Sequence, residues 1–148
     1  MFVYIKFSPD TTKTLLSYFH KNNQNMELLN NHTTVKSKHD TAHVTLDVQN
    51  EFHYKIYKEN EISVTVIGHV VNNYGFAFVV IINDDIFGKK NQINNAKYLH
   101  ITMMLNKVKP VYCRYMMEKY VGGLKETTDD VDFTKYDDPF VVNGKLFL

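Results

Sequence analysis

The chain has 148 residues and a formal net charge of +1, with 17 Lys and Arg against 16 Asp and Glu. These values favour a single domain over residues 1–148 and do not favour a broad basic platform, so no long nucleic acid is expected as a partner. The one cysteine, Cys113, excludes an internal disulfide framework and a cysteine-rich zinc module. No apolar run reaches the roughly 20 residues that cross a bilayer, and the N-terminus lacks the order of a secretory signal. The sequence therefore predicts a cytoplasmic protein with no membrane partner.

The first half of the chain predicts strands separated by one helix. Residues 2–7 alternate as a strand does, and Ser8-Pro9 provides a helix N-cap followed by a first-turn proline. The helix is expected to continue to about residue 21, with a short turn near residues 26–29. Residues 42–48 are expected to form the next strand.

The second half predicts mainly strands. Residues 52–57 alternate, and the β-branched stretch 62–71 is joined by Asn72-Asn73 to residues 75–82 in the clearest hairpin of the chain. Further strands are expected over 98–105 and at the C-terminus, with a helix over 111–120 and an exposed acidic stretch over 129–138. Because strands and helices mix without regular β-α-β alternation, an antiparallel-rich α+β fold is expected.

One pattern occurs twice on predicted strands: His43-Val44-Thr45-Leu46 and His100-Ile101-Thr102-Met103. Residues i and i+2 of a strand point to the same face, so each copy presents an imidazole and a hydroxyl together. A single copy is usually only a polar strand face. Chance, however, predicts roughly 0.15 copies in such a chain, and two or more in about one chain in a hundred. The paired pattern is therefore the strongest functional signal in the sequence.

Two histidines and two threonines suit the cleavage of a phosphodiester. One imidazole can remove a proton from the attacking oxygen while the other, protonated, donates one to the leaving oxygen. The threonine hydroxyls can bind the charged nonbridging oxygens. A bound phosphate would also favour the protonated form of one ring.

The two His-x-Thr motifs, 57 residues apart, resemble those of the two-histidine (LigT-like) phosphoesterase superfamily. The resemblance covers most of the chain in layout and is specific only at the motifs. It implies a bilobal α+β fold with antiparallel-rich sheets and pseudo-twofold symmetry around a central groove. It also implies metal-independent hydrolysis, with His43, Thr45, His100 and Thr102 as the catalytic residues.

The chain is most similar to the compact viral branch of that superfamily, which includes phage anti-CBASS nucleases and avian-poxvirus LigT-like proteins. This resemblance implies a cyclic dinucleotide substrate such as 2′,3′-cyclic GMP-AMP, a role in the host cytoplasm against cGAS-STING immunity, and no cofactor. His100 is then the expected base and His43 the expected acid, although the reverse assignment remains open.

Substrate binding is expected to use aromatic faces and lysines near the motifs. Aromatic residues close to strand ends or to the second motif can stack on bases, although most aromatic side chains in such a chain belong to the core. Lysines just after the second motif can attract phosphate. The candidates are Tyr4, Phe7, Tyr74, Lys107, Lys109 and Tyr112.

Other interpretations remain open. A zinc site at His39 and His43 would need a helix, which conflicts with the β-branched residues 42–48, so no metal is expected. A 2′-5′ oligoadenylate or 2′,3′-cyclic-phosphate RNA phosphodiesterase would use the same four residues. A module that sequesters a nucleotide without cleaving it, or an interaction domain in which the motifs are coincidental, would not be an enzyme.

Overall fold

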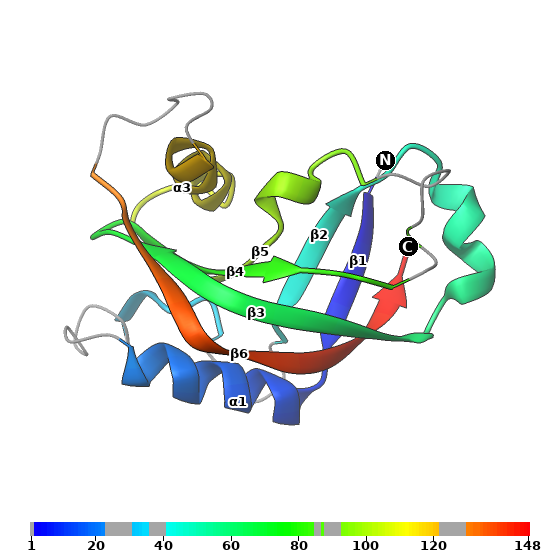
Figure 1. Ribbon diagram of the computed structural model, residues 1–148, viewed down its shortest axis with the longest axis horizontal. Helices are drawn as coiled ribbons and strands as arrows, with labels where there is room; N and C mark the ends of the chain where they lie inside the picture. Colours follow the sequence, from blue (N-terminus) through cyan, green and yellow to red (C-terminus); the bar gives the residue numbers. More distant parts are fainter. Residues whose placement is uncertain (1, 23–30, 36–40, 85–86, 88–92, 122–129) are drawn as a thin grey trace.

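The computed structural model describes residues 2–22, 31–35, 41–84, 87, 93–121 and 130–148 (Figure 1). Six antiparallel strands form a closed barrel in the order β1-β2-β5-β4-β3-β6, with β6 returning to pair with β1. The strands are β1 (Phe2–Phe7), β2 (His43–Asp47), β3 (Glu61–Val71), β4 (Gly75–Ile81), β5 (His100–Leu105) and β6 (Asp132–Phe147).

The barrel shows that the expected bilobal α+β fold is wrong. The cause is β6, which extends over 16 residues and pairs with β3 along one edge and with β1 along the other. The first and last strands therefore close the sheet around one core, where the expected fold has two lobes around a groove. The acidic stretch, which was expected to be exposed, contributes Asp132, Asp137 and Asp138 to this strand, and all three are exposed.

The strand predictions for both motifs, for residues 2–7 and for the hairpin are confirmed. The helix after Ser8 is confirmed as α1 (Pro9–Lys21), where the Ser8 hydroxyl accepts a hydrogen bond from the Thr11 amide at 3.1 Å. The second predicted helix is α3 (Tyr112–Val121). Residues 26–29 and 129 lie outside the described part of the chain.

Residues 51–57 form a 3₁₀ helix, η1 (Glu51–Tyr57), and the strand expected there is absent. The Asn50 side chain caps this helix by accepting a hydrogen bond from the Phe52 amide at 3.1 Å. Tyr54 is its buried anchor, while Phe52 and Ile56 are exposed. The alternating apolar residues therefore belong to a 3₁₀ helix in which only the Tyr54 ring is buried.

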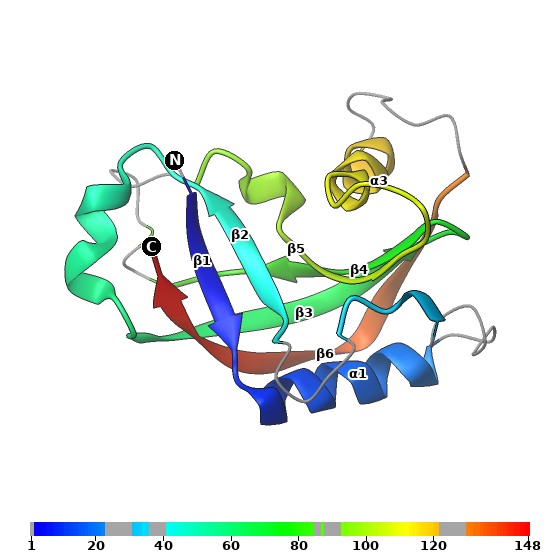
Figure 2. The ribbon, with the colours of Figure 1, turned by 180° about the vertical axis from the view of Figure 1, so that it is seen from behind.

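Side chains of the strands and of α1 fill the barrel core, and α3 covers part of the barrel exterior. Phe19 of α1 packs against Phe76 of β4 with ring centroids 4.8 Å apart. Residues of α3, including Met116, pack on the outer side of β3 and β4 in a second cluster with Val70 and Ala77. Figure 2 shows β1 and β2 side by side, with α1 below them and α3 to one side. In the described part of the chain, no helix is both long enough and apolar enough to cross a membrane.

Candidate active site

The barrel makes the two motif strands neighbours. β2 and β5 pair in antiparallel register with Val44 opposite Ile101. Counting outward along this register puts His43 beside Thr102 and Thr45 beside His100. The two histidines occupy one diagonal of a four-residue cluster, and the two threonines occupy the other.

The cluster faces outward. Val44 and Ile101 are fully buried inside the barrel, so the alternate residues of both strands lie on its outer surface. His43 is exposed, whereas the other three members of the cluster are half-buried. Diagonal neighbours on such a pair are roughly 7–8 Å apart, and their Cβ atoms are somewhat closer. This separation leaves room for one phosphate group between the imidazoles.

The pairing of β2 with β5 is short, and side chains on both sides of it hold the strands. The buried Asn95 donates a hydrogen bond to the carbonyl oxygen of Thr45 at 3.2 Å and accepts one from the amide of Asp47 at 3.0 Å. On the other side, the Thr34 hydroxyl donates to the carbonyl oxygen of Thr102 at 3.1 Å. These contacts fix the backbone at two of the four cluster positions, Thr45 and Thr102, and at Asp47 beside them.

His100 has a defined tautomer. Its Nδ1 lies 2.7 Å from the carbonyl oxygen of Tyr98, which can only accept a hydrogen bond, so Nδ1 carries the proton. In the neutral ring, Nε2 is then a free acceptor. Burial lowers the pKa of His100; the Tyr98 carbonyl opposes this shift, and the charges of Arg114 and His43 add to it. His100 is thus a neutral imidazole able to act as a base.

His43 lies between an aromatic ring and a cation on β1. The Tyr4 ring meets the imidazole edge-on at a centroid distance of 6.1 Å, and Lys6 is directly opposite His43 in the β1–β2 register. Partial desolvation by its neighbours lowers the pKa of His43, and the positive charge of Lys6 lowers it further. An anion bound at the cluster would counter this effect and favour the imidazolium.

Thr102 has a second contact beneath α3. Its side chain hydrogen-bonds to the Cys113 thiol, although burial still raises the pKa of that thiol to about 12. Cys113 is fully buried and also donates weakly to the carbonyl oxygen of Phe76 at 3.9 Å. The thiol is therefore a protonated packing group in contact with the Thr102 side chain.

Arg114 is a site residue that the motif analysis missed. Its guanidinium lies over the Tyr98 ring at 4.1 Å and its Nε donates to the Glu118 carboxylate at 2.9 Å. These contacts hold a cation close enough to affect the pKa of His100. One signal was available in the sequence, because Arg114 is the only arginine beside 16 lysines.

The structure brings only Tyr4 of the predicted substrate-binding residues to the cluster. Phe7 belongs to the barrel core and also lines the pocket beside β1. Tyr74 and Tyr112 pack edge-on against each other at 6.1 Å near the β3–β4 turn. The two predicted lysines, Lys107 and Lys109, follow the end of β5 that is opposite to His100, and both are exposed.

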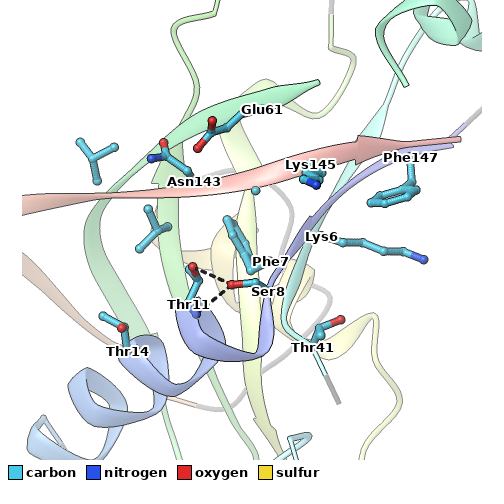
Figure 3. Close-up of a pocket in the computed structure, with 13 residues that line it drawn as sticks. Lys6, Phe7, Ser8, Thr11, Thr14, Thr41, Glu61, Asn143, Lys145 and Phe147 are labelled. Atoms are coloured by element: carbon cyan, nitrogen blue, oxygen red, sulfur yellow. Dashed lines mark hydrogen bonds between the residues drawn. The ribbon is translucent and has the colours of Figure 1, made fainter. Parts of the chain in front are cut away.

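An open pocket of about 770 Å³ has Lys6, the residue opposite His43 on β1, among its lining residues (Figure 3). It lies over β1 and β6, next to the start of α1. Lys6, Lys145 and Phe147 are among its lining residues. Sequence reasoning did not identify Lys6 or Lys145, because they approach each other only through the pairing of the first and last strands.

Among the described residues, no group of three or more His, Cys, Asp and Glu side chains is placed to hold a metal ion. His39, which was considered as a zinc ligand with His43, lies outside the described residues. The sequence matches no model of a known protein family and no curated protein.

Proposed function

We propose that the protein is a phosphodiesterase of the two-histidine type that needs no metal. The supporting observation is the diagonal arrangement of His43 and His100, with Thr45 and Thr102 between them, on adjacent antiparallel strands. General acid–base catalysis requires two titratable groups on opposite sides of one phosphate, and this arrangement supplies them. The proposal concerns the catalytic residues and does not depend on a bilobal fold.

In the proposed reaction, Nε2 of His100 removes the proton from a ribose hydroxyl next to the scissile linkage. The hydroxyl oxygen attacks phosphorus, and the bond from phosphorus to the 5′ oxygen breaks. The imidazolium of His43 donates its proton to that leaving oxygen, so the product carries a cyclic phosphate at the attacked ribose. The hydroxyls of Thr45 and Thr102 donate hydrogen bonds to the nonbridging oxygens, where negative charge increases in the transition state.

The proposed substrate is a cyclic dinucleotide such as 2′,3′-cyclic GMP-AMP, and the proposed role is viral evasion of host cGAS-STING immunity in the cytoplasm. In this substrate, the ribose of the 2′-5′ linkage keeps a free 3′-hydroxyl that can attack the adjacent phosphorus. The Tyr4 ring beside His43 offers a face on which a base can stack. The substrate and role otherwise rest on the resemblance of the motifs to the viral two-histidine enzymes.

The test is incubation of the protein in EDTA with 2′,3′-cyclic GMP-AMP, 3′,3′-cyclic GMP-AMP, 2′-5′ oligoadenylate and 2′,3′-cyclic AMP, followed by chromatography. His43→Ala and His100→Ala should each lower kcat by about 10²- to 10⁴-fold because each removes a proton-transfer group. His53→Ala is the matched control, since His53 lies on η1 and should leave kcat unchanged.

The outcomes separate the alternatives. Loss of activity in EDTA, or full activity in both motif variants, would refute the proposed mechanism. Cleavage of oligoadenylate or the cyclic mononucleotide alone would keep the mechanism and replace the substrate. Tight binding of a cyclic dinucleotide that is recovered intact would instead identify a sequestering module.

A further inference from the structure

Outward-facing residues of β1 and β6 continue the surface that carries the motif residues. Lys6 is opposite His43 on one side and opposite Lys145 on the other. One row of side chains therefore crosses four neighbouring strands, from Thr102 through His43 and Lys6 to Lys145. In the next row, Tyr4 lies between Thr45 and Phe147.

The two lysines form an unusual pair. Like charges directly opposite each other on neighbouring strands are destabilising. Glu61 faces Lys145 from β3, yet within the described ranges neither ammonium group forms an ion pair. Lys6 instead lies over the Phe147 ring, 5.2 Å from its centroid. An anion bound between the two ammonium groups would remove their repulsion.

These lysines line the open pocket of about 770 Å³, which is in the size range of ligand sites (Figure 3). Phe147 contributes an aromatic side chain to the pocket, and Asn143 and Thr41 contribute polar groups. Ser8 also lines it, but its hydroxyl already caps α1. The pocket thus combines two lysines, the Glu61 carboxylate, an aromatic surface and hydrogen-bonding groups.

The spacing of the strands relates this pocket to the histidines. Neighbouring strands are about 4.8 Å apart, so Lys6 and Lys145 lie roughly 5 and 10 Å from the strand position of His43. A phosphodiester held at the histidines would leave room in this direction for one nucleoside and the phosphate beyond it. A substrate with a single phosphate would not extend to Lys145.

We propose that Lys6 and Lys145 bind a second phosphate of the substrate, one nucleoside away from the phosphate that is cleaved, with Phe147 packing against that nucleoside. This inference rests on the proposed function and adds a basis for specificity. A dinucleotide with two phosphates gains both the lysines and the ring, whereas a 2′,3′-cyclic mononucleotide gains neither.

The experiment compares kcat/KM for 2′,3′-cyclic GMP-AMP and for 2′,3′-cyclic AMP in the wild type and in Lys145→Met. The ratio of the two values should fall about tenfold in the variant, mainly through a higher KM for the dinucleotide. Lys145→Arg should restore the ratio because it keeps the charge. Lys135→Met is the control, because Lys135 is an exposed lysine of the same strand that lies opposite Gly68 and away from the pocket.

An equal decrease for both substrates, or an unchanged ratio, would overturn the second subsite and leave the proposed function intact. If neither substrate is cleaved, the proposed function fails, and calorimetric binding of 2′,3′-cyclic GMP-AMP decides the subsite. Binding that weakens about tenfold in Lys145→Met but not in Lys135→Met would support it. No binding, or equal binding by the wild type, Lys145→Met and Lys135→Met, would refute the second subsite.

Discussion

The histidines of this protein differ in what surrounds them, and the surroundings decide their chemistry. His43 and His100 face outward, and their pKa values are lowered first by desolvation and then by nearby cations. His69 lies inside the barrel, stacked on Phe76 at a centroid distance of 4.7 Å and hydrogen-bonded to the Tyr136 hydroxyl at 2.6 Å. Of these three histidines, only His43 and His100 face a surface where a bound anion could favour the protonated ring.

Burial of His69 predicts that the fold loses stability in acid. Burial lowers the pKa of His69 to about 4, from about 6.5 in the unfolded chain. The unfolded state therefore binds more protons between these values, and stability that is complete above pH 6.5 is lost as pH falls toward 4. The loss is about 3 kcal/mol, from about 1.4 kcal/mol for each pKa unit.

Urea unfolding at pH 7 and pH 4 measures this loss. His69→Gln cannot titrate, so the change in unfolding free energy between the two pH values should be smaller in the variant by about 3 kcal/mol. His53→Gln is the control, because His53 is not enclosed by the barrel. Equal pH dependence in wild type and His69→Gln would show that His69 does not resist protonation.

At the scale of elements, α3 connects the core to the candidate site. Its inner face packs on β3 and β4, and Cys113 contacts Thr102. Its Arg114 stacks on Tyr98 and pairs with Glu118, which is largely buried. The position of this one helix therefore places both a thiol against Thr102 and a cation near His100.

Arg114→Met should change the pH dependence of catalysis. One histidine must be protonated and the other neutral, and both pKa values are lowered, so kcat/KM of the wild type should be highest below pH 6.5. Removal of the Arg114 cation raises the pKa of His100 and should move the profile toward higher pH. A profile that does not move would contradict the electrostatic role of Arg114.

Stability gives a separate measurement for this variant. Arg114→Met leaves the Glu118 carboxylate without its partner and should lower the unfolding free energy by about 1–3 kcal/mol. Arg114→Met/Glu118→Met removes the unpaired charge and should recover much of that loss while keeping the shifted pH profile. If the shift of the pH profile disappears in the double variant, disturbed packing and not the lost charge would be its cause.

At the scale of the whole molecule, pairing of the two chain ends closes the barrel. Gly144 of β6 lies opposite Phe7 of β1, and a Cβ atom there would be 2.6 Å from Ile5 Cγ2 and 2.9 Å from the Lys6 carbonyl oxygen. Only a glycine allows the two strands to approach this closely. The same pairing brings Lys145 to Lys6, so closure also builds the proposed second subsite.

Gly144→Val should therefore weaken closure. Overpacking of this kind typically costs about 1–3 kcal/mol, which urea unfolding can measure. Amide hydrogen exchange in β1 should become faster because its pairing with β6 loosens. Val141→Thr on the exposed side of the same strand is the control. It should change the unfolding free energy by no more than about 0.5 kcal/mol and leave the exchange rates in β1 unchanged. Unchanged exchange in Gly144→Val would contradict this role for the glycine.

The sequence by itself determined the local geometry of the site. Strand alternation placed His43 with Thr45, and His100 with Thr102, because side chains two residues apart on a strand share a face. The capped helix after Ser8 and the hairpin around Asn72 were likewise predictable, since caps and turns depend on neighbouring residues.

Only the tertiary structure decided which strands became neighbours. The pairing of β2 with β5 and the closure of β6 on β1 join residues far apart in the chain, and they depend on burial of the whole core. Lys6 and Lys145 meet through the closure of β6 on β1, and Arg114 comes near His100 through the packing of α3, so no local pattern placed them at the site. The functional side chains of each strand could thus be predicted from the local sequence. The assembly of the strands into one surface depended on the closed barrel.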